Sequence, residues 1–128
     1  MPLVRIDTFD AVHDAAARGA FGQVVYGALR AIGVPEGDRF QILAGHAPGA
    51  LVYGSDYLGI KRTDGFVAIQ ITLNSGRTLA QKRTLFAAIA DGLARLGVRR
   101  QDVFVNLVET AKENWSFGNG EAQYAEAG

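Results

Sequence analysis

Cysteine is absent from the 128 residues of this chain. Its absence excludes disulfides, thiolate nucleophiles, zinc-thiolate sites and iron-sulfur clusters. His13 and His46 are the two histidines, and they remain as the imidazole ligands that a metal could use. We therefore expect no catalytic metal and no other cofactor.

An excess of one charge is also absent, because 13 Lys and Arg balance 13 Asp and Glu. The chain thus lacks the bulk field that draws proteins to nucleic acid or to anionic membranes. Its apolar runs are far shorter than the roughly 18 residues that span a bilayer. The segment from Met1 to Arg5 lacks the basic and then apolar order of a secretory signal. We expect no nucleic-acid partner, no membrane partner and a cytoplasmic location.

The length of 128 residues fits a single domain, since domains usually hold about 100 to 200 residues. Hydrophobic residues make up 48% of the chain and charged residues 20%, as in soluble globular proteins and unlike disordered chains. We expect one domain, 1–128, with one hydrophobic core.

An internal repeat divides this domain into halves of about 1–64 and 65–128. The stretch from Gly33 to Leu43 recurs as Gly97 to Leu107, at an offset of 64 residues. The match continues upstream without a gap, and pairs Thr8 with Thr72, Ala16 with Ala80 and Leu29 with Leu93. Such a match indicates a duplicated supersecondary unit.

Each half has the pattern of a strand, a helix and a second strand. In the second half, apolar residues alternate along 66–73, which is typical of a half-buried strand. A capping box at Thr78 and Gln81 begins a helix over about 78–96, and Gly97 ends it. The matching helix over about 11–32 ends at Gly33. The apolar stripes of the two helices are Phe21, Val25, Leu29 and Ile32, and Phe86, Ile89, Leu93 and Leu96.

Two such units predict a fold that mixes helices and strands, α/β in the broad sense and α+β in the narrower classification. The duplicated β-α-β units would form a four-stranded sheet with both helices on one face. The other face would be bare, with apolar strand residues such as Phe40, Ile42, Val103 and Val105. We expect other copies of the chain to cover that face.

Two further segments complete the chain. The glycine-rich stretch 44–63 carries Tyr53 and Tyr57, which favours an ordered loop over a linker. The tail from Lys112 contains Trp115, Phe117 and Tyr124, and we expect it to pack as an arm.

Pro2 is the most informative residue for function. Removal of the initiator methionine before a small residue would expose Pro2 as a secondary amine. An α-amino group titrates near 8, so it can act as an acid or a base at physiological pH. The alternative is a proline that simply begins an edge strand.

The sequence resembles the tautomerase superfamily, and within it the malonate semialdehyde decarboxylase group. The resemblance covers nearly the whole chain and is carried by the segments 2–7, 34–42 and 114–120, the last of which reads Asn114-Trp115-Ser116-Phe117-Gly118-Asn119-Gly120. It implies a catalytic amino-terminal proline and a homotrimer.

Asp38 resembles the functional aspartate of that group, which is expected near the prolyl nitrogen. A carboxylate beside the amine favours its protonated form, and so favours acid chemistry such as decarboxylation or hydration. The alternative is a residue at a helix exit, because Asp102 holds the equivalent place in the second half.

Arg77 stands between the end of an apolar strand and the Thr78 cap, where its guanidinium and the helix amides can hold a small carboxylate substrate. The alternative is a solvated arginine. The malonate semialdehyde decarboxylase group usually has two arginines here, one residue apart, whereas this chain has Ser75 and Arg77. We count Ser75 among the substrate-binding residues.

Trp115 and Phe117 resemble the apolar wall of the group's pocket, which would disfavour a carboxylate and favour its loss as carbon dioxide. Ordinary packing of the arm is the alternative. His13 and His46 receive no role.

Three hypotheses follow from these residues. The first is a cofactor-free lyase that decarboxylates a small 3-oxo acid such as malonate semialdehyde, with Pro2, Asp38 and Arg77 as catalytic residues. The second is a tautomerase of enolpyruvates in which Pro2 is the general base. The third is a nonenzymatic, ferredoxin-like binding module.

Overall fold

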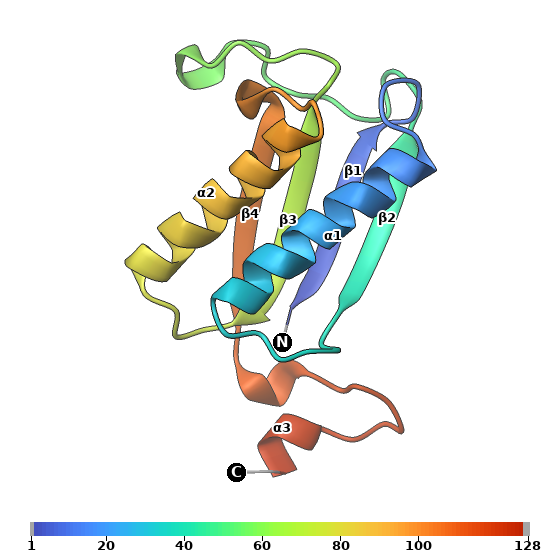
Figure 1. Cartoon of the computed structure of the whole chain (residues 1–128). Coiled ribbons are helices and arrows are strands. Elements are labelled where there is room, and N and C mark those ends of the chain that lie inside the picture. Colours follow the sequence, from blue (N-terminus) through green and yellow to red (C-terminus); the bar gives the residue numbers. More distant parts are fainter. Residues whose placement is uncertain (1, 127–128) are drawn as a thin grey trace.

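The computed structural model describes residues 2–126, which form a four-stranded sheet covered on one face by two helices (Figure 1). The strands are β1 (Leu3–Phe9), β2 (Phe40–His46), β3 (Val67–Asn74) and β4 (Val103–Thr110), and the two long helices are α1 (Ala15–Ala31) and α2 (Leu79–Arg95). The short helical segments are η1 (Tyr57–Gly59), η2 (Arg100–Asp102), η3 (Lys112–Asn114) and α3 (Gln123–Glu126). This α+β architecture confirms the predicted fold class.

The sheet has the order β2-β1-β3-β4, with each parallel pair joined by its own helix. The two units meet at the antiparallel pair of β1 and β3. There Leu3 faces Thr72, and Thr8 faces Val67. At the repeat offset of 64, Leu3 corresponds to Val67 and Thr8 to Thr72, so the two pairs are equivalent. The repeat in the sequence is therefore an approximate twofold relationship in the structure.

The helix ends repeat as well. Asp14 accepts a hydrogen bond from the Ala17 amide at 2.9 Å, and Thr78 accepts one from the Gln81 amide at 3.1 Å. The first helix begins at Ala15, so its predicted start near residue 11 was wrong. Residues 11–14 form a turn, because the Asp14 carboxylate caps the helix and ends the preceding loop.

The core lies between the helices and the inner face of β1 and β3. Its residues from the strands are Val4, Ile6, Val67, Ile69, Ile71 and Leu73, and those from the helices include Phe21, Val25, Leu29, Leu85, Ile89 and Leu93. In α2 the predicted stripe was wrong at both ends, since Phe86 is 38% exposed and Leu96 48% exposed. Leu85 takes the inward position, and it is the residue that matches Phe21 in the repeat.

Gly92 allows the two helices to approach each other closely. A Cβ atom built on Gly92 would collide with the side chain of Val24 on α1. Gly92 is itself buried in the inward face of α2. A larger side chain at this position would therefore push the helices apart.

The outer face of the sheet is uncovered in the single chain. Phe40, Ile42 and Phe104 lie on it and are 48%, 44% and 48% exposed. Val103 and Val105, which we expected on this face, pack instead against the helix side. Strand alternation explains the difference, because Phe104 between them points the other way.

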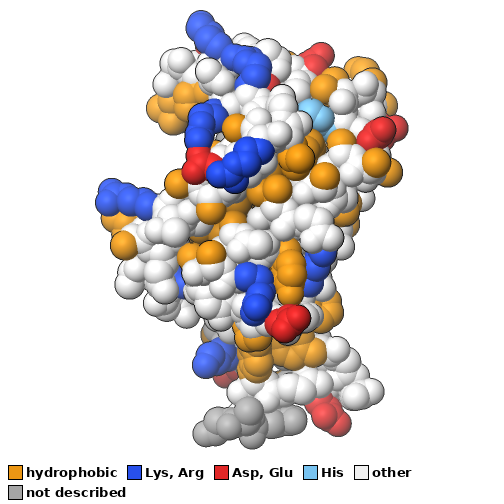
Figure 2. Space-filling model, in the orientation of Figure 1, with side chains coloured by type: hydrophobic (Ala, Val, Ile, Leu, Met, Phe, Trp, Pro, Cys, Tyr) orange, Lys and Arg blue, Asp and Glu red, His pale blue; other side chains and the backbone are white. Residues whose placement is uncertain are grey.

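The helix side carries a mixture of charges. Figure 2 shows Lys and Arg side chains scattered over it beside acidic ones, without a continuous basic stripe. Among the described residues, no helix is long and apolar enough to cross a membrane.

Candidate active site

Four segments that are distant in the sequence meet at one end of the sheet, near the amino terminus (Figure 1). They are the start of β1, the loop before β2, the turn between β3 and α2, and the C-terminal arm with η3 and α3. Pro2 is buried at this end, directly before β1. Its neighbour Leu3 pairs with Phe40 on one side and Thr72 on the other, so Pro2 lies between β2 and β3.

Arg77 lies in the turn before α2 and is half-buried. Its Nη1 atom donates a hydrogen bond to the Asn74 carbonyl at 3.0 Å. Its Nε atom is buried and has no hydrogen-bond partner among the described residues. A buried guanidinium N–H without an acceptor is costly, and a bound carboxylate would supply the acceptor.

Ser75 is exposed beside this turn. Its amide donates to the Thr110 carbonyl at 3.0 Å, and its hydroxyl makes a longer contact of 3.4 Å with the same oxygen. These bonds fasten the turn to the end of β4. Ser75 thus stands near Arg77 but is already engaged with the backbone.

Glu109 adds a second fastening to the same turn. Lys82 lies 2.7 Å from it, and this hydrogen bond and the Lys82 charge hold the pKa of the Glu109 carboxyl below its usual range. The Gly76 amide and the Arg77 charge lower that pKa further. Arg77 is therefore bonded to a backbone carbonyl and lies within electrostatic range of the Glu109 carboxylate.

The C-terminal arm forms an aromatic wall. Trp115 and Phe117 are stacked, with their ring centres 5.9 Å apart and their planes at 8°. Together with Leu3, Phe40 and Ser116 they line a hollow of about 260 Å³. In Figure 2 hydrophobic atoms also gather where the arm meets the body of the protein.

Tyr124, in α3, was missed as a site residue. Its ring contacts Phe117 edge-on, with a centroid distance of 4.8 Å. Burial raises the pKa of Tyr124 above its ordinary value of 10.0, the Asp38 carboxylate raises it further, and the Arg77 guanidinium opposes the rise. Asp38 and Arg77 therefore both lie within electrostatic range of the Tyr124 phenol.

Asn74 was also missed, although it connects two of the predicted site residues. It is buried at the end of β3, where its carbonyl accepts from Arg77 and its Oδ1 atom accepts from the Trp115 indole at 2.7 Å. A signal was present in the sequence, because Asn74 is a polar residue directly after the apolar alternation of β3.

The two histidines lie elsewhere, and neither belongs to a metal cluster. The ring of His13 bonds to the Gly65 carbonyl at 2.9 Å, and that of His46 to Asp7 at 2.6 Å. In the part of the chain that the structure describes, no three side chains of His, Cys, Asp or Glu are grouped to hold a metal.

A family model described as "Tautomerase enzyme" matches residues 38–118. The chain belongs to the tautomerase family. The matched range includes Asp38, Ser75, Arg77, Trp115 and Phe117, and it leaves out Pro2 and Tyr124. Since the family is one of enzymes, the hypothesis of a nonenzymatic binding module is set aside.

Curated relatives carry the same family name. The chain is 41% identical over 99 residues to the probable tautomerase YusQ of Bacillus subtilis (strain 168), which covers 77% of this chain and 78% of the relative. It is 30% identical over 125 residues to the probable tautomerase YrdN of the same organism, with coverage of 97% and 96%.

Solved structures show which members of the tautomerase family this chain resembles in its fold. The chain matches FG41 malonate semialdehyde decarboxylase, inhibited by 3-bromopropiolate, with a TM-score of 0.91 and 38% identity, over 98% of this chain and 95% of that one. A second malonate semialdehyde decarboxylase, studied for its decarboxylase and hydratase activities, matches with a TM-score of 0.88 and 31% identity, over 98% and 97%. This tautomerase family enzyme is thus close in structure to malonate semialdehyde decarboxylases.

Proposed function

We propose that this enzyme is a cofactor-free lyase that removes carbon dioxide from a small 3-oxo acid such as malonate semialdehyde, in the cytoplasm. The observation that carries the proposal is the buried Nε atom of Arg77, which has no hydrogen-bond partner among the described residues and lies at the same end of the sheet as the aromatic wall. A carboxylate can dock on that guanidinium while the wall excludes water. The similarity to two malonate semialdehyde decarboxylases supports this choice of substrate class.

In the proposed reaction, Arg77 holds the substrate carboxylate through two parallel hydrogen bonds. Removal of Met1, which lies outside the described residues, leaves Pro2 with a secondary amine. The Asp38 carboxylate favours the protonated form of that amine, and the cation then polarises the 3-oxo group. As the bond to the carboxylate carbon breaks, its electron pair moves toward the polarised carbonyl and forms an enolate. Carbon dioxide leaves, and the enolate takes up one proton at carbon from solvent water.

The aromatic wall of Trp115 and Phe117 favours that step over simple binding. A carboxylate beside apolar rings is poorly solvated, whereas neutral carbon dioxide is not penalised there. Ser75 stands where the resembling group has its other arginine. With a hydroxyl in place of that cation, we propose that Ser75 contacts the substrate and that Arg77 alone binds its charge.

The proposed assembly is a homotrimer. The exposed Phe40, Ile42 and Phe104 on the outer face of the sheet need a cover. A structure similar to this chain, with a TM-score of 0.75 and 25% identity, is a symmetric trimer of a fused 4-OT. We propose that three copies cover their sheets in the same way.

A tautomerase that acts on enolpyruvates, with neutral Pro2 as the general base, is the second candidate. The two curated relatives named as probable tautomerases favour it. The pH profile separates the two chemistries. Activity that falls as the amine loses its proton supports the cationic acid, and activity that rises supports the base.

A substrate panel of 3-oxo acids and enolpyruvates, run on tag-free protein, tests the proposal. Intact mass must first show that Met1 has been removed. Carbon dioxide release from malonate semialdehyde, strongest at pH values where the amine is protonated, is the expected result. Turnover of enolpyruvates alone would contradict the decarboxylase and favour the tautomerase.

A further inference from the structure

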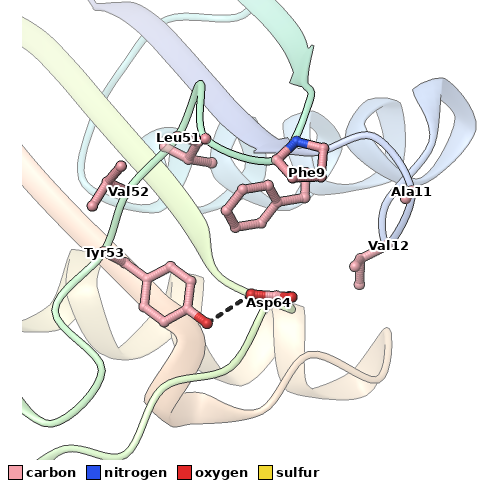
Figure 3. Close-up of a pocket in the computed structure, with 9 residues that line it drawn as sticks. Phe9, Ala11, Val12, Leu51, Val52, Tyr53 and Asp64 are labelled. Atoms are coloured by element: carbon pink, nitrogen blue, oxygen red, sulfur yellow. Dashed lines mark hydrogen bonds between the residues drawn. The ribbon is translucent and has the colours of Figure 1, made fainter.

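The duplication places a second set of residues at the opposite end of the sheet. The wall segment Trp115 to Phe117 corresponds, at the offset of 64, to Leu51 to Tyr53. Leu51, Val52 and Tyr53 likewise line a hollow, of about 320 Å³, together with Phe9 and Val12 (Figure 3). This volume lies at the lower end of the range for ligand pockets, about 300 to 1,000 Å³.

The cations proposed for the first end have no counterparts in this second hollow. Phe66 corresponds to Pro2, but it lies inside the chain and its ring stacks on Tyr53 at 5.3 Å. His13 corresponds to Arg77, and its ring is bonded to the Gly65 carbonyl. Among the described residues that line the hollow, Asp64 is the one charged side chain. The charged side chain that lines this hollow is therefore an anion, whereas Arg77 at the first end is a cation.

The nearby arginines are already engaged. Arg18 forms an ion pair with Asp10 at 2.9 Å and donates to the His13 carbonyl at 2.7 Å. Arg62 donates to three backbone carbonyls of its own loop, the shortest bond being 2.8 Å to Gly54. Within the described residues, neither forms an ion pair with Asp64.

Two aromatic rings and the carboxylate surround the space. The rings of Phe9 and Tyr53 stand edge to face with centres 6.1 Å apart, and the Tyr53 hydroxyl donates to Asp64 Oδ1 at 2.7 Å (Figure 3). The hydrogen bond to Asp64 raises the pKa of Tyr53, which keeps the phenol neutral. The second oxygen of Asp64 makes no hydrogen bond among the described residues. Aromatic faces beside a carboxylate are a setting that binds organic cations.

We propose that this hollow is a second ligand site, and that it binds a small organic ammonium ion. The cation would pair with the Asp64 carboxylate and contact the rings of Phe9 and Tyr53, while Val12 and Leu51 enclose the apolar body of the ligand. No lysine or arginine is among the described residues that line the hollow, and the proposal is one of binding alone. The inference does not depend on the proposed decarboxylase chemistry.

Three probes with the same ring and methylene group test the charge preference. Benzylammonium, benzyl alcohol and phenylacetate are titrated separately into the native protein, and amide chemical shifts are followed by NMR. Benzylammonium is expected to bind about tenfold more tightly than benzyl alcohol, with saturable shifts at Val12, Val52 and Tyr53. Phenylacetate should be the weakest at this end.

Matched carboxylate variants locate the effect. Asp64→Asn should weaken benzylammonium about tenfold and leave benzyl alcohol unchanged, since the amide still accepts from Tyr53. Asp56→Asn, an exposed carboxylate in the same loop that does not line the hollow, should change neither. Equal loss in both variants, or equal binding of all three probes, would overturn the proposal.

A second copy of the chain is the competing occupant, because Val52 is 82% exposed at the mouth of the hollow. If another copy covers it, Val52→Asp will reduce the mass of the native assembly, and benzylammonium will give no saturable shifts in the wild type. That pair of results would contradict the ligand site. An unchanged mass together with saturable binding would support it. None of these experiments measures catalytic turnover. A result that contradicts the second ligand site therefore leaves the proposed decarboxylase function unaffected.

Discussion

Asn74 and Trp115, 41 residues apart in the chain, are joined by a hydrogen bond of 2.7 Å from the indole Nε1 to the amide Oδ1. The carbonyl of the same Asn74 holds the guanidinium of Arg77. One buried residue thus sets the position of the proposed anion-binding group and of the aromatic wall. The proposed chemistry needs both in a fixed relation to the substrate.

Asn74→Ala should disturb the site through Trp115, because it removes the Oδ1 acceptor of the indole and keeps the backbone carbonyl that accepts from Arg77. Loss of the acceptor leaves a partly buried indole N–H unsatisfied, which typically costs about 1–3 kcal/mol of unfolding free energy. Trp115 is the single tryptophan, so its emission spectrum reports on this bond directly. We expect a shifted emission maximum, a less stable protein and a raised KM. Asn114→Ala changes an exposed asparagine beside Trp115 and is the control; an identical response in both variants would contradict the positioning role.

Arg77→Gln should weaken substrate binding, because it removes the cation and keeps part of the hydrogen-bonding capacity. A charge-assisted hydrogen bond is worth about 1.5–3 kcal/mol, so kcat/KM should fall about tenfold to a hundredfold. Steady-state kinetics with malonate semialdehyde measure the change. Arg83→Gln, on an exposed position of α2, should leave kcat/KM unchanged. Wild-type kinetics in Arg77→Gln would remove this residue from the site.

The pair of Leu85 and Phe86 tests the corrected stripe of α2. Leu85 is 1% exposed in the core and Phe86 is 38% exposed. Leu85→Ala should lower the unfolding free energy by about 2–5 kcal/mol, through lost burial and the cavity left behind. Phe86→Ala should cost clearly less in the same chemical denaturation experiment, and a larger loss for Phe86 would show that the stripe is misplaced.

Asp7 gives stability a dependence on pH. Burial raises the pKa of its carboxyl, but hydrogen bonds from Arg5 and His46 outweigh burial and bring the pKa below its ordinary value of 3.8. A depressed carboxyl pKa stabilises the folded state. This contribution is fully present at pH values above the pKa of the unfolded state, about 3.9, and is lost as pH falls through the pKa of the folded state. The difference in unfolding free energy between wild type and Asp7→Asn should be fully present at about pH 5.

Below about pH 4 that difference should shrink as Asp7 takes up its proton. Denaturation at several pH values measures it. Asp56→Asn serves as the control. Asp56 is exposed, and its carboxylate does not cap the short helix η1 that follows it. A difference that grows toward low pH would contradict the assignment.

The architecture could be predicted because the repeat gives two sequence patterns for the same supersecondary unit, and each pattern supports the elements predicted from the other. The match of Gly33 with Gly97 and of Leu29 with Leu93 gave two equal units, and short-range patterns were enough to identify their elements. The inward position at the start of α2 was misjudged because Leu85 and Phe86 are adjacent apolar residues. Hydrophobicity alone does not separate such neighbours, whereas alignment with Phe21 would have done so.

The site was only partly accessible from the sequence. Asp38, Trp115 and Phe117 could be named from the family resemblance, and Arg77 from its place between a strand end and a helix cap. The structure places these residues at one end of the sheet with buried Pro2. In the sequence, Asn74 stands out only as a polar residue after an apolar alternation, and Tyr124 only as an aromatic residue of the arm. Both act through contacts between distant segments. Their roles depend on where the C-terminal arm folds back, which a linear pattern does not encode.

The amine of Pro2 is central to the account, and turnover of malonate semialdehyde by the Pro2→Ala variant tests it most directly. With Met1 removal verified by mass and folding verified by circular dichroism, the rate of carbon dioxide release should fall at least about a hundredfold. Pro35→Ala, at an exposed proline, should retain the wild-type rate. Carbon dioxide release from Pro2→Ala at the wild-type rate would contradict the account.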